Sequence, residues 1–182
     1  MIQNKQGVYL ILAIFLLGGA VIWLNQNKST EPEPLKNTVT SEPATNSTDT
    51  FTNTHAIVYK SPTCGCCSGH AEAMVASGIE VEIVETDHAE LLFFKEDKAV
   101  PSNLWSCHTT LLSEGEREYV VEGHVPIEAI EKLVKEKPDI KGVALSGMPS
   151  GTPGMPGPKM GPYDVMTIEH GAEGEPQLYI SI

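Results

Sequence analysis

The stretch that decides the fold is AIVYKSPTCGCC, residues 56–67. It opens with a short apolar and β-branched run at 56–59, which predicts a buried strand. Residues 68–77 carry apolar side chains on one helical face, and Gly78 is a stop signal. Three of the four cysteines therefore lie on a strand-to-helix turn, close to a helix N-terminus.

The helix N-terminus gives these thiols a particular chemistry. Unpaired N–H groups and the helix dipole favour negative charge there. A thiol on this turn is expected to have a lowered pKa, and the thiolate is the form that attacks disulfides or binds metals. The turn is therefore expected to carry two or three thiolates.

Composition limits the class of partner. The chain has 182 residues and a formal net charge of −12. A nucleic-acid backbone requires a basic face, so the acidic balance argues against nucleic acid as a partner, and it also argues against docking to anionic lipid. Attraction of cations is compatible with this charge, although a solvated acidic surface is the commoner cause.

The N-terminal region does not look like folded domain. Residues 8–24 are apolar and uncharged, at the short end for a membrane span. The two interpretations are a cleaved secretory signal and an uncleaved anchor, and both place the rest of the chain outside the cytoplasm. We favour the anchor, because no small-x-small cleavage site follows the apolar run.

The chain is accordingly expected to have three parts. Residues 1–24 are the membrane anchor or signal segment, attached to the inner membrane through 8–24. Residues 25–54 are rich in Thr, Ser, Asn, Pro and Glu and are expected to form a flexible polar linker. Residues 55–182 are long enough for one folded domain with its own core.

The folded part alternates between strand and helix patterns. Strands are expected at 56–59, 79–85, 109–112 and 118–121, and helices at 68–77, from Thr86 or Asp87 to about Lys98, and from Pro126 to just before Pro138. The order β-α-β-α-β-β-α predicts an α/β domain of the thioredoxin-like type. A Gly/Pro/Met loop at 146–162 and a C-terminal hairpin, 163–169 with 177–182, complete the domain.

The spacing of the cysteines points to a site. Cys64 and Cys67 have the C-x-x-C spacing of a thioredoxin active site, with Cys66 as an addition inside the motif. Cys107 precedes the third strand, and in a thioredoxin-like fold that position faces the active-site turn. We therefore expect the fold to bring all four sulfur atoms together.

Clustered thiolates in an exported domain favour a soft metal. Thiolates and thioethers select Cu(I), and Cys64, Cys66, Cys67 and Cys107 are the candidate ligands. Close C-x-C-C spacing favours bridging sulfurs and more than one copper ion. One tetrahedral zinc is a less favoured alternative, because the paired C-x-x-C knuckles are absent. A purely structural pair of disulfides is the other alternative, with 64–67 and 66–107 as one pairing.

Histidines and methionines are weaker candidates. His108 adjoins Cys107, and His124 precedes a helix, so either is a candidate ligand. His70 follows Cys66 by one helical turn and is more simply an exposed helix residue. The loop methionines are Met148, Met155 and Met160, and each is more often packing or surface than ligand. His55, His88 and His170 are expected on the solvated surface.

Five motifs, taken in their order along the chain, are similar to those of one known family. They are YKSPTCGCC at 59–67, VP at 100–101, SCHT at 106–109, EGHVP at 122–126 and GMPSGTPGM at 147–155. Together, over roughly residues 55–170, they resemble the CopG-type family of periplasmic copper-resistance proteins. The resemblance implies a thioredoxin-like fold, export in Gram-negative bacteria, copper held by the four cysteines, and a role in copper redox handling.

Three functional hypotheses follow. The first is a periplasmic copper-binding protein, tethered to the inner membrane, that serves copper tolerance by buffering, by delivery to an efflux or chaperone partner, or by Cu(I)/Cu(II) conversion. The second is a thiol–disulfide oxidoreductase in which Cys64 attacks and Cys67 resolves. The third is an exported structural module with two disulfides.

Overall fold

The computed structural model describes residues 36–38, 49–171 and 174–182. These residues form strands β1 (Lys36–Thr38), β2 (Thr54–Lys60), β3 (Glu80–Glu85), β4 (His108–Glu114), β5 (Arg117–Glu122), β6 (Gly142–Ala144), β7 (Asp164–Ile168) and β8 (Leu178–Ser181). The α-helices are α2 (Gly65–Ala76), α3 (His88–Asp97) and α4 (Ile127–Glu136). Two short 3-10 helices, η1 (Asp49–Phe51) and η2 (Ser102–Leu104), complete the elements.

The strands form one mixed sheet in the order β1-β3-β2-β4-β5-β6-β7-β8. Strand β2 runs parallel to β3 and antiparallel to β4, and β5 runs parallel to β6; the other pairs are antiparallel. The register places Lys60 beside His108 and Thr109 beside Glu122. These pairings bring the C-terminal ends of β2 and β5 and the N-terminal end of β4 together at one end of the central strands.

The β-α-β-α-β-β-α order of a mixed α/β domain, predicted from the sequence, is observed from β2 to α4. The C-terminal hairpin is also observed, as antiparallel β7 and β8. Two details differ. Helix α2 begins at Gly65 and not at residue 68, so two cysteines lie in its first turn. Strand β6 was missed, because three residues are too few for a periodic pattern to show.

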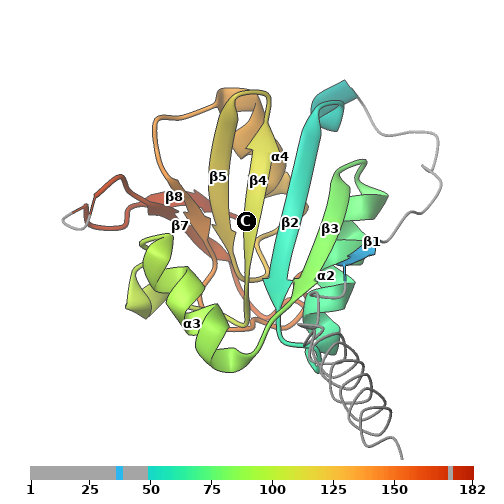
Figure 1. Cartoon of the computed structure of the whole chain (residues 1–182). Helices are drawn as coiled ribbons and strands as arrows, with labels where there is room; N and C mark the ends of the chain where they lie inside the picture. The colour runs from blue at the N-terminus through green and yellow to red at the C-terminus, as the bar shows by residue number, and fades with distance from the viewer. Residues whose placement is uncertain (1–35, 39–48, 172–173) are drawn as a thin grey trace, which may run out of the picture. The chain divides into compact units, whose positions relative to one another are not determined.

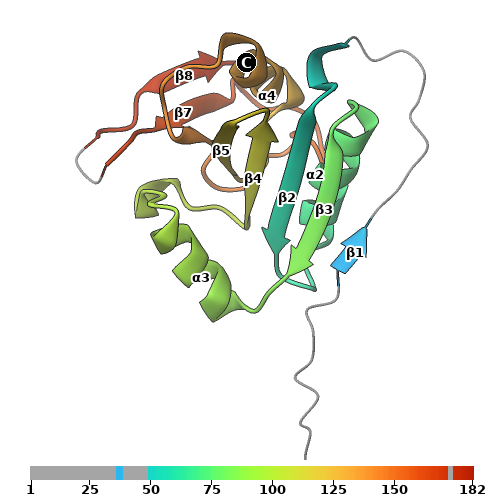
Figure 2. The ribbon, with the colours of Figure 1, turned by 45° about the horizontal axis from the view of Figure 1, so that its top comes forward.

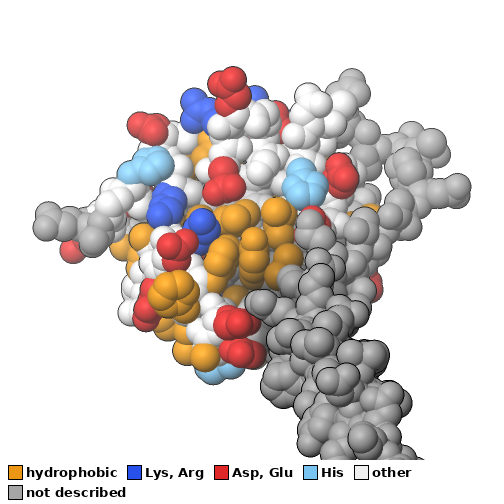
Figure 3. Space-filling model, in the orientation of Figure 1, with side chains coloured by type: hydrophobic (Ala, Val, Ile, Leu, Met, Phe, Trp, Pro, Cys, Tyr) orange, Lys and Arg blue, Asp and Glu red, His pale blue; other side chains and the backbone are white. Residues whose placement is uncertain are grey.

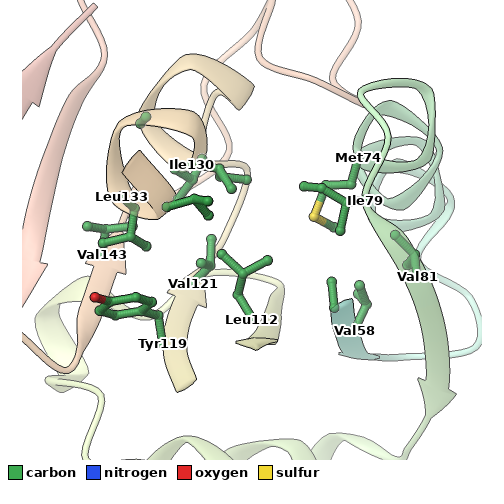
Figure 4. Close-up of a cluster of buried hydrophobic side chains, with 14 of the residues drawn as sticks. Val58, Met74, Ile79, Val81, Leu112, Tyr119, Val121, Ile130, Leu133 and Val143 are labelled. Atoms are coloured by element: carbon green, nitrogen blue, oxygen red, sulfur yellow. The ribbon is translucent and has the colours of Figure 1, made fainter. Parts of the chain in front are cut away.

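Apolar side chains pack on both faces of the sheet. On one face, α2 and α4 cover a large cluster (Figures 1 and 2). In Figure 4, Met74 of α2 and Ile130 of α4 point toward Val58, Leu112 and Val121 of the strands. A smaller cluster on the other face includes Leu111 and Val120, with Phe94 of α3 packed against it. Strand neighbours alternate between the two clusters, as the pleat of a strand requires.

The face that carries α3 is less completely covered. Figure 3 shows apolar side chains gathered in the middle of this face, with charged side chains around them. Tyr59 stacks on Phe94 of α3 with ring centroids 4.0 Å apart, and both belong to the partly buried margin of the smaller cluster. Phe93, the next residue of the same helix, is 72% exposed. A single helix therefore leaves part of this apolar face in contact with solvent.

The folded domain begins a little before residue 55. Phe51 is buried in the larger core cluster, and β2 starts at Thr54. Within the segment 25–54, which was expected to be a linker, β1 also pairs with β3. Among the helices of the described residues, none has both the length and the apolar character that crossing a membrane requires. The expected anchor at 8–24 lies outside the described residues.

Helix α3 is capped as its sequence predicts. The Asp87 side chain accepts a hydrogen bond from the Glu90 backbone N–H at 2.9 Å. Replacing Asp87 with alanine is expected to lower the free energy of unfolding by about 1 kcal/mol, because one N–H at the helix start loses its acceptor. Urea denaturation measures this, with Asp97→Ala at the other end of α3 as the control. Equal losses in the two variants would contradict the capping assignment.

Candidate metal centre

The cysteine turn lies where β2 meets α2. Cys64 occupies the position before the first helical residue, and Cys66 and Cys67 lie in the first turn. Cys64 and Cys67 form a disulfide with their Cα atoms 5.4 Å apart, while Cys66 and Cys107 are free thiols. Of the two bridges that the structural-module hypothesis needs, only 64–67 is therefore formed.

The fourth cysteine joins this turn from the start of β4. The Sγ atom of Cys107 lies 3.4 Å from that of Cys67, and the Sγ atoms of Cys64 and Cys66 are 3.5 Å apart. All four sulfur atoms lie within 4.8 Å of one another. The convergence predicted from the sequence is therefore observed, whereas ligation of a metal by these four residues stays a prediction.

A cluster of three buried histidines lies beside the sulfur atoms. His70 comes from α2, His108 from β4 and His124 from the loop between β5 and α4, and each side chain is 0% exposed. Their ring centroids are 4.9 to 5.4 Å apart. Nδ1 of His108 and Nε2 of His124 lie 3.4 and 3.2 Å from Sγ of Cys107. The site is therefore a joined sulfur and imidazole cluster.

Burial sets the charge state of the cluster. Loss of solvation lowers the pKa of His70 to about 4, and it also lowers the pKa of His108, well below its ordinary value, and of His124. Burial, reinforced by the charge of Cys66, raises the pKa of the Cys107 thiol to about 11. At neutral pH the three imidazoles are therefore uncharged, and Cys107 loses its proton only when a cation takes its place.

A buried ion pair fixes the backbone of Ser106, the residue that precedes Cys107. Glu122, 0% exposed, accepts hydrogen bonds from Lys95 of α3 at 2.5 Å and from the Thr109 hydroxyl at 2.6 Å. The same carboxylate accepts the Ser106 backbone N–H at 2.6 Å. Lys95 is itself 1% exposed and donates to Thr109 as well. The position of Cys107 thus depends on a charge pair buried at this end of β4 and β5.

The Gly/Pro/Met loop lies over the same end of these strands. The carbonyl of Gly147 accepts the Ser106 hydroxyl at 2.6 Å, and the carbonyl of Pro153 accepts from His124 at 2.8 Å. Gly154 has a φ of 81°, and a Cβ there would lie 2.3 Å from the Cys66 carbonyl oxygen. The loop therefore contacts α2 backbone to backbone, directly beside the cysteine turn. Met148 and Met160 are exposed.

One prediction about the residues of this centre was wrong. His70 was expected to be exposed, and the structure buries it. A signal was available, because Cys67, His70, Ala71 and Met74 follow the i, i+3, i+4, i+7 spacing of one buried helical face. His108 and His124, named as weaker candidates, both lie at the site. Of the histidines expected at the surface, His88 and His170 are exposed.

Comparison with known proteins gives this geometry a context. The family described as "Protein of unknown function, DUF411" matches residues 104–155, which include Cys107, His108 and His124. The comparison with curated proteins found no match. Two solved structures are similar, "Copper resistance protein copG- Form 1" and its Form 2.

Both solved structures cover the greater part of the chain. Form 1 is 30% identical, with a TM-score of 0.60 over 70% of this chain and 96% of its own. Form 2 is 32% identical, with a TM-score of 0.59 over 71% of this chain and 98% of its own. Identity at this level over nearly the whole length of the relative shows common descent as well as a common fold. The chain therefore belongs to the CopG family of copper-resistance proteins.

Proposed function

We propose that the protein binds copper as Cu(I) through the thiolates of Cys64, Cys66, Cys67 and Cys107 and serves copper tolerance. The observation that carries the proposal is the convergence of four sulfur atoms within 4.8 Å of one another. Thiolates are the ligands that Cu(I) prefers, and such short separations allow one sulfur to bridge neighbouring ions. More than one Cu(I) per chain is therefore part of the proposal, with zinc as the less favoured ion.

The disulfide adds a redox role to this proposal. When Cys64 and Cys67 are joined, two of the four sulfurs are no longer thiolates. Forming the disulfide from two thiols releases two protons and two electrons. The two electrons reduce two Cu(II) to two Cu(I). Reduction of the disulfide by a cellular dithiol restores the four-thiolate set. Conversion between Cu(II) and Cu(I) is thus chemically available at this site.

The setting of this activity is also part of the proposal. The β-α-β-α-β-β-α order with C-x-x-C at the start of α2 supports a thioredoxin-like domain. The apolar segment 8–24 supports tethering to the periplasmic face of the bacterial inner membrane. Copper would then be passed to an efflux or chaperone protein in the same compartment.

A second candidate function is thiol–disulfide exchange on exported proteins. The observation that favours it is the Cys64–Cys67 disulfide itself, formed across a C-x-x-C motif at a helix N-terminus. It ranks second because it gives no role to Cys66 and Cys107. Reduction of insulin by the metal-free protein at a rate comparable to thioredoxin would favour this candidate.

Titration with Cu(I) tests the first proposal. The reduced full chain, kept anaerobic, is expected to retain one or more Cu(I) ions per chain after a competing chelator is added. Cys64→Ser with Cys107→Ser is expected to lose most of this copper, because two of four soft ligands become hydroxyls. Ser102→Ala, an exposed change outside the site, is the control. Less than one ion per chain, unchanged in the double variant, would end the proposal.

A further inference from the structure

A groove lies between helix α2 and the strands on which it packs. Figures 1 and 2 show α2 against β2 and β3, near the margin of the sheet where β1 is the outer strand. The groove has a volume of about 270 Å³. One wall consists of side chains spaced i, i+3, i+4 and i+7 on a single face of α2: Ser68, Ala71, Glu72 and Val75. Val81 and Ile83 of β3 form the opposite wall, so apolar side chains face each other across the groove.

Lys60 lies at the end of the groove nearest the cysteine turn. It is the last residue of β2, directly before that turn, and it lines the groove together with Glu85, its register partner on β3. Its side chain shares one face of β2 with Ala56 and Val58, so it lies under α2 and not in open solvent. The residue is 2% exposed. The groove is therefore apolar along its walls and has a buried ammonium group at one end.

The ammonium group of Lys60 has donors to spare. Lysine carries three N–H donors and no acceptor. Among the described residues, its only hydrogen-bond acceptor is the Glu85 carboxylate, 3.3 Å from Nζ. Buried polar groups are nearly always hydrogen-bonded, so the other donors need acceptors that enter the groove. A neutral carbonyl oxygen suits them better than a carboxylate, because Glu72 and Glu85 already line the groove with negative charge.

We propose that this groove binds an extended peptide segment of a partner protein. An aliphatic side chain of the segment lies between α2 and β3, and a backbone carbonyl next to it accepts a hydrogen bond from Lys60. Pockets that hold a whole small-molecule ligand measure about 300–1,000 Å³, so a groove of about 270 Å³ suits one side chain with its adjoining peptide groups. A peptide supplies the apolar group and the neutral acceptor in one unit.

The position of the groove gives this contact a use. Its helix wall begins at Ser68, directly after Cys67, and Lys60 directly precedes the turn that carries Cys64. A partner held here has its own chain beside the cysteine turn, where its thiols or thioethers come within reach of the cluster. Binding of the peptide does not depend on copper. Its use in passing copper or electrons to a partner rests on the proposed function.

Two capped tripeptides are the probes, acetyl-Gly-Leu-Gly-amide and acetyl-Gly-Gly-Gly-amide. Each is added to the metal-free, oxidised full chain with isotope-labelled valine and isoleucine methyl groups, and NMR follows the methyl signals. We expect the leucine peptide to shift Val75, Val81 and Ile83 in a saturable way, with a dissociation constant in the millimolar range because a short flexible peptide loses freedom on binding. The glycine peptide is expected to leave them in place. Val120, in the smaller cluster on the other face of the sheet, is expected not to respond to either.

Substitutions then separate the two halves of the contact. Lys60→Met keeps the length of the side chain and is expected to weaken binding of the leucine peptide by about 10–100-fold, because a hydrogen bond from a charged donor is lost. Lys135→Met, which removes an exposed lysine of α4, is the control and is expected to bind as the wild-type chain does. Val75→Phe fills the groove and is expected to abolish the shifts of Val81 and Ile83.

The comparison of the two peptides needs only the wild-type chain, so it holds whether or not a variant folds. A saturable shift of the groove methyl groups with the leucine peptide alone supports the proposal. No saturable shift, an equal response to both peptides, or a response at Val120 in place of the groove would overturn it. Because the protein is free of metal, each of these outcomes is independent of whether the reduced chain binds Cu(I).

Discussion

Glu122→Gln is expected to lower the free energy of unfolding by about 3–5 kcal/mol, the largest stability loss that we expect from a single polar substitution. The carboxylate and the Lys95 ammonium are almost completely buried and lie 2.5 Å apart. Glutamine keeps the shape of the side chain but leaves the ammonium charge without its counter-charge in the protein interior. Breaking a buried pair on one side costs far more than losing an exposed pair.

Urea denaturation of the metal-free, oxidised protein at pH 7 measures this loss. Glu136→Gln is the matched control, because it removes the partner of Lys132 in an exposed pair on α4 and should cost less than about 1 kcal/mol. Lys95→Met with Glu122→Leu removes both charges and is expected to recover much of the stability. If both glutamine variants lost the same free energy of unfolding, the buried pair would contribute no more to stability than the exposed pair.

Acidification is expected to destabilise the metal-free protein strongly between pH 6.5 and pH 4. Burial lowers the pKa of His70 to about 4 in the folded state, from an ordinary value of 6.5. The unfolded chain therefore binds more protons in this interval, and stability falls as pH falls. By linkage, His70 alone contributes a loss of about 2 kcal/mol at pH 5 and about 3 kcal/mol at pH 4. His108 and His124 act in the same direction.

Urea midpoints at pH 7, 6 and 5 measure this effect, and the slope with pH gives the number of protons taken up on unfolding. His70→Gln is expected to reduce that slope, because glutamine does not titrate. His88→Gln, an exposed histidine at the start of α3, is expected to leave it unchanged. A stability that is flat or rises on acidification would be incompatible with an uncharged histidine cluster.

Local patterns predicted much of the fold, because the elements that were found have strong local signals. Asp87 and Glu90 have the spacing of a capping box, and Asp87 caps α3 as expected. Strand β6 has only three residues, and it is a strand because β5 and β7 pair with it on either side. Such a strand depends on partners distant in sequence, so periodicity does not reveal it.

The sequence likewise predicted part of the site, its cysteines, but not the charged residues that support them. The C-x-C-C turn and Cys107 were found because the expected topology places a residue before β4 opposite the turn. The buried pair of Lys95 and Glu122 was missed, because charged residues on a helix and a strand normally face solvent. The pairing of Glu122 with Thr109 in the sheet, and the contact of Glu122 with Lys95, become visible only in three dimensions.

The contact of Gly69 with Gly154 has a consequence for attaching reporter groups to this protein. A Cβ on Gly69 would lie 2.9 Å from the Cα of Gly154, so the two main chains touch with no side chain between them. Dyes and spin labels near this seam would push the two segments apart. Met160, 81% exposed in the same loop, is a position where a label would stay outside this contact.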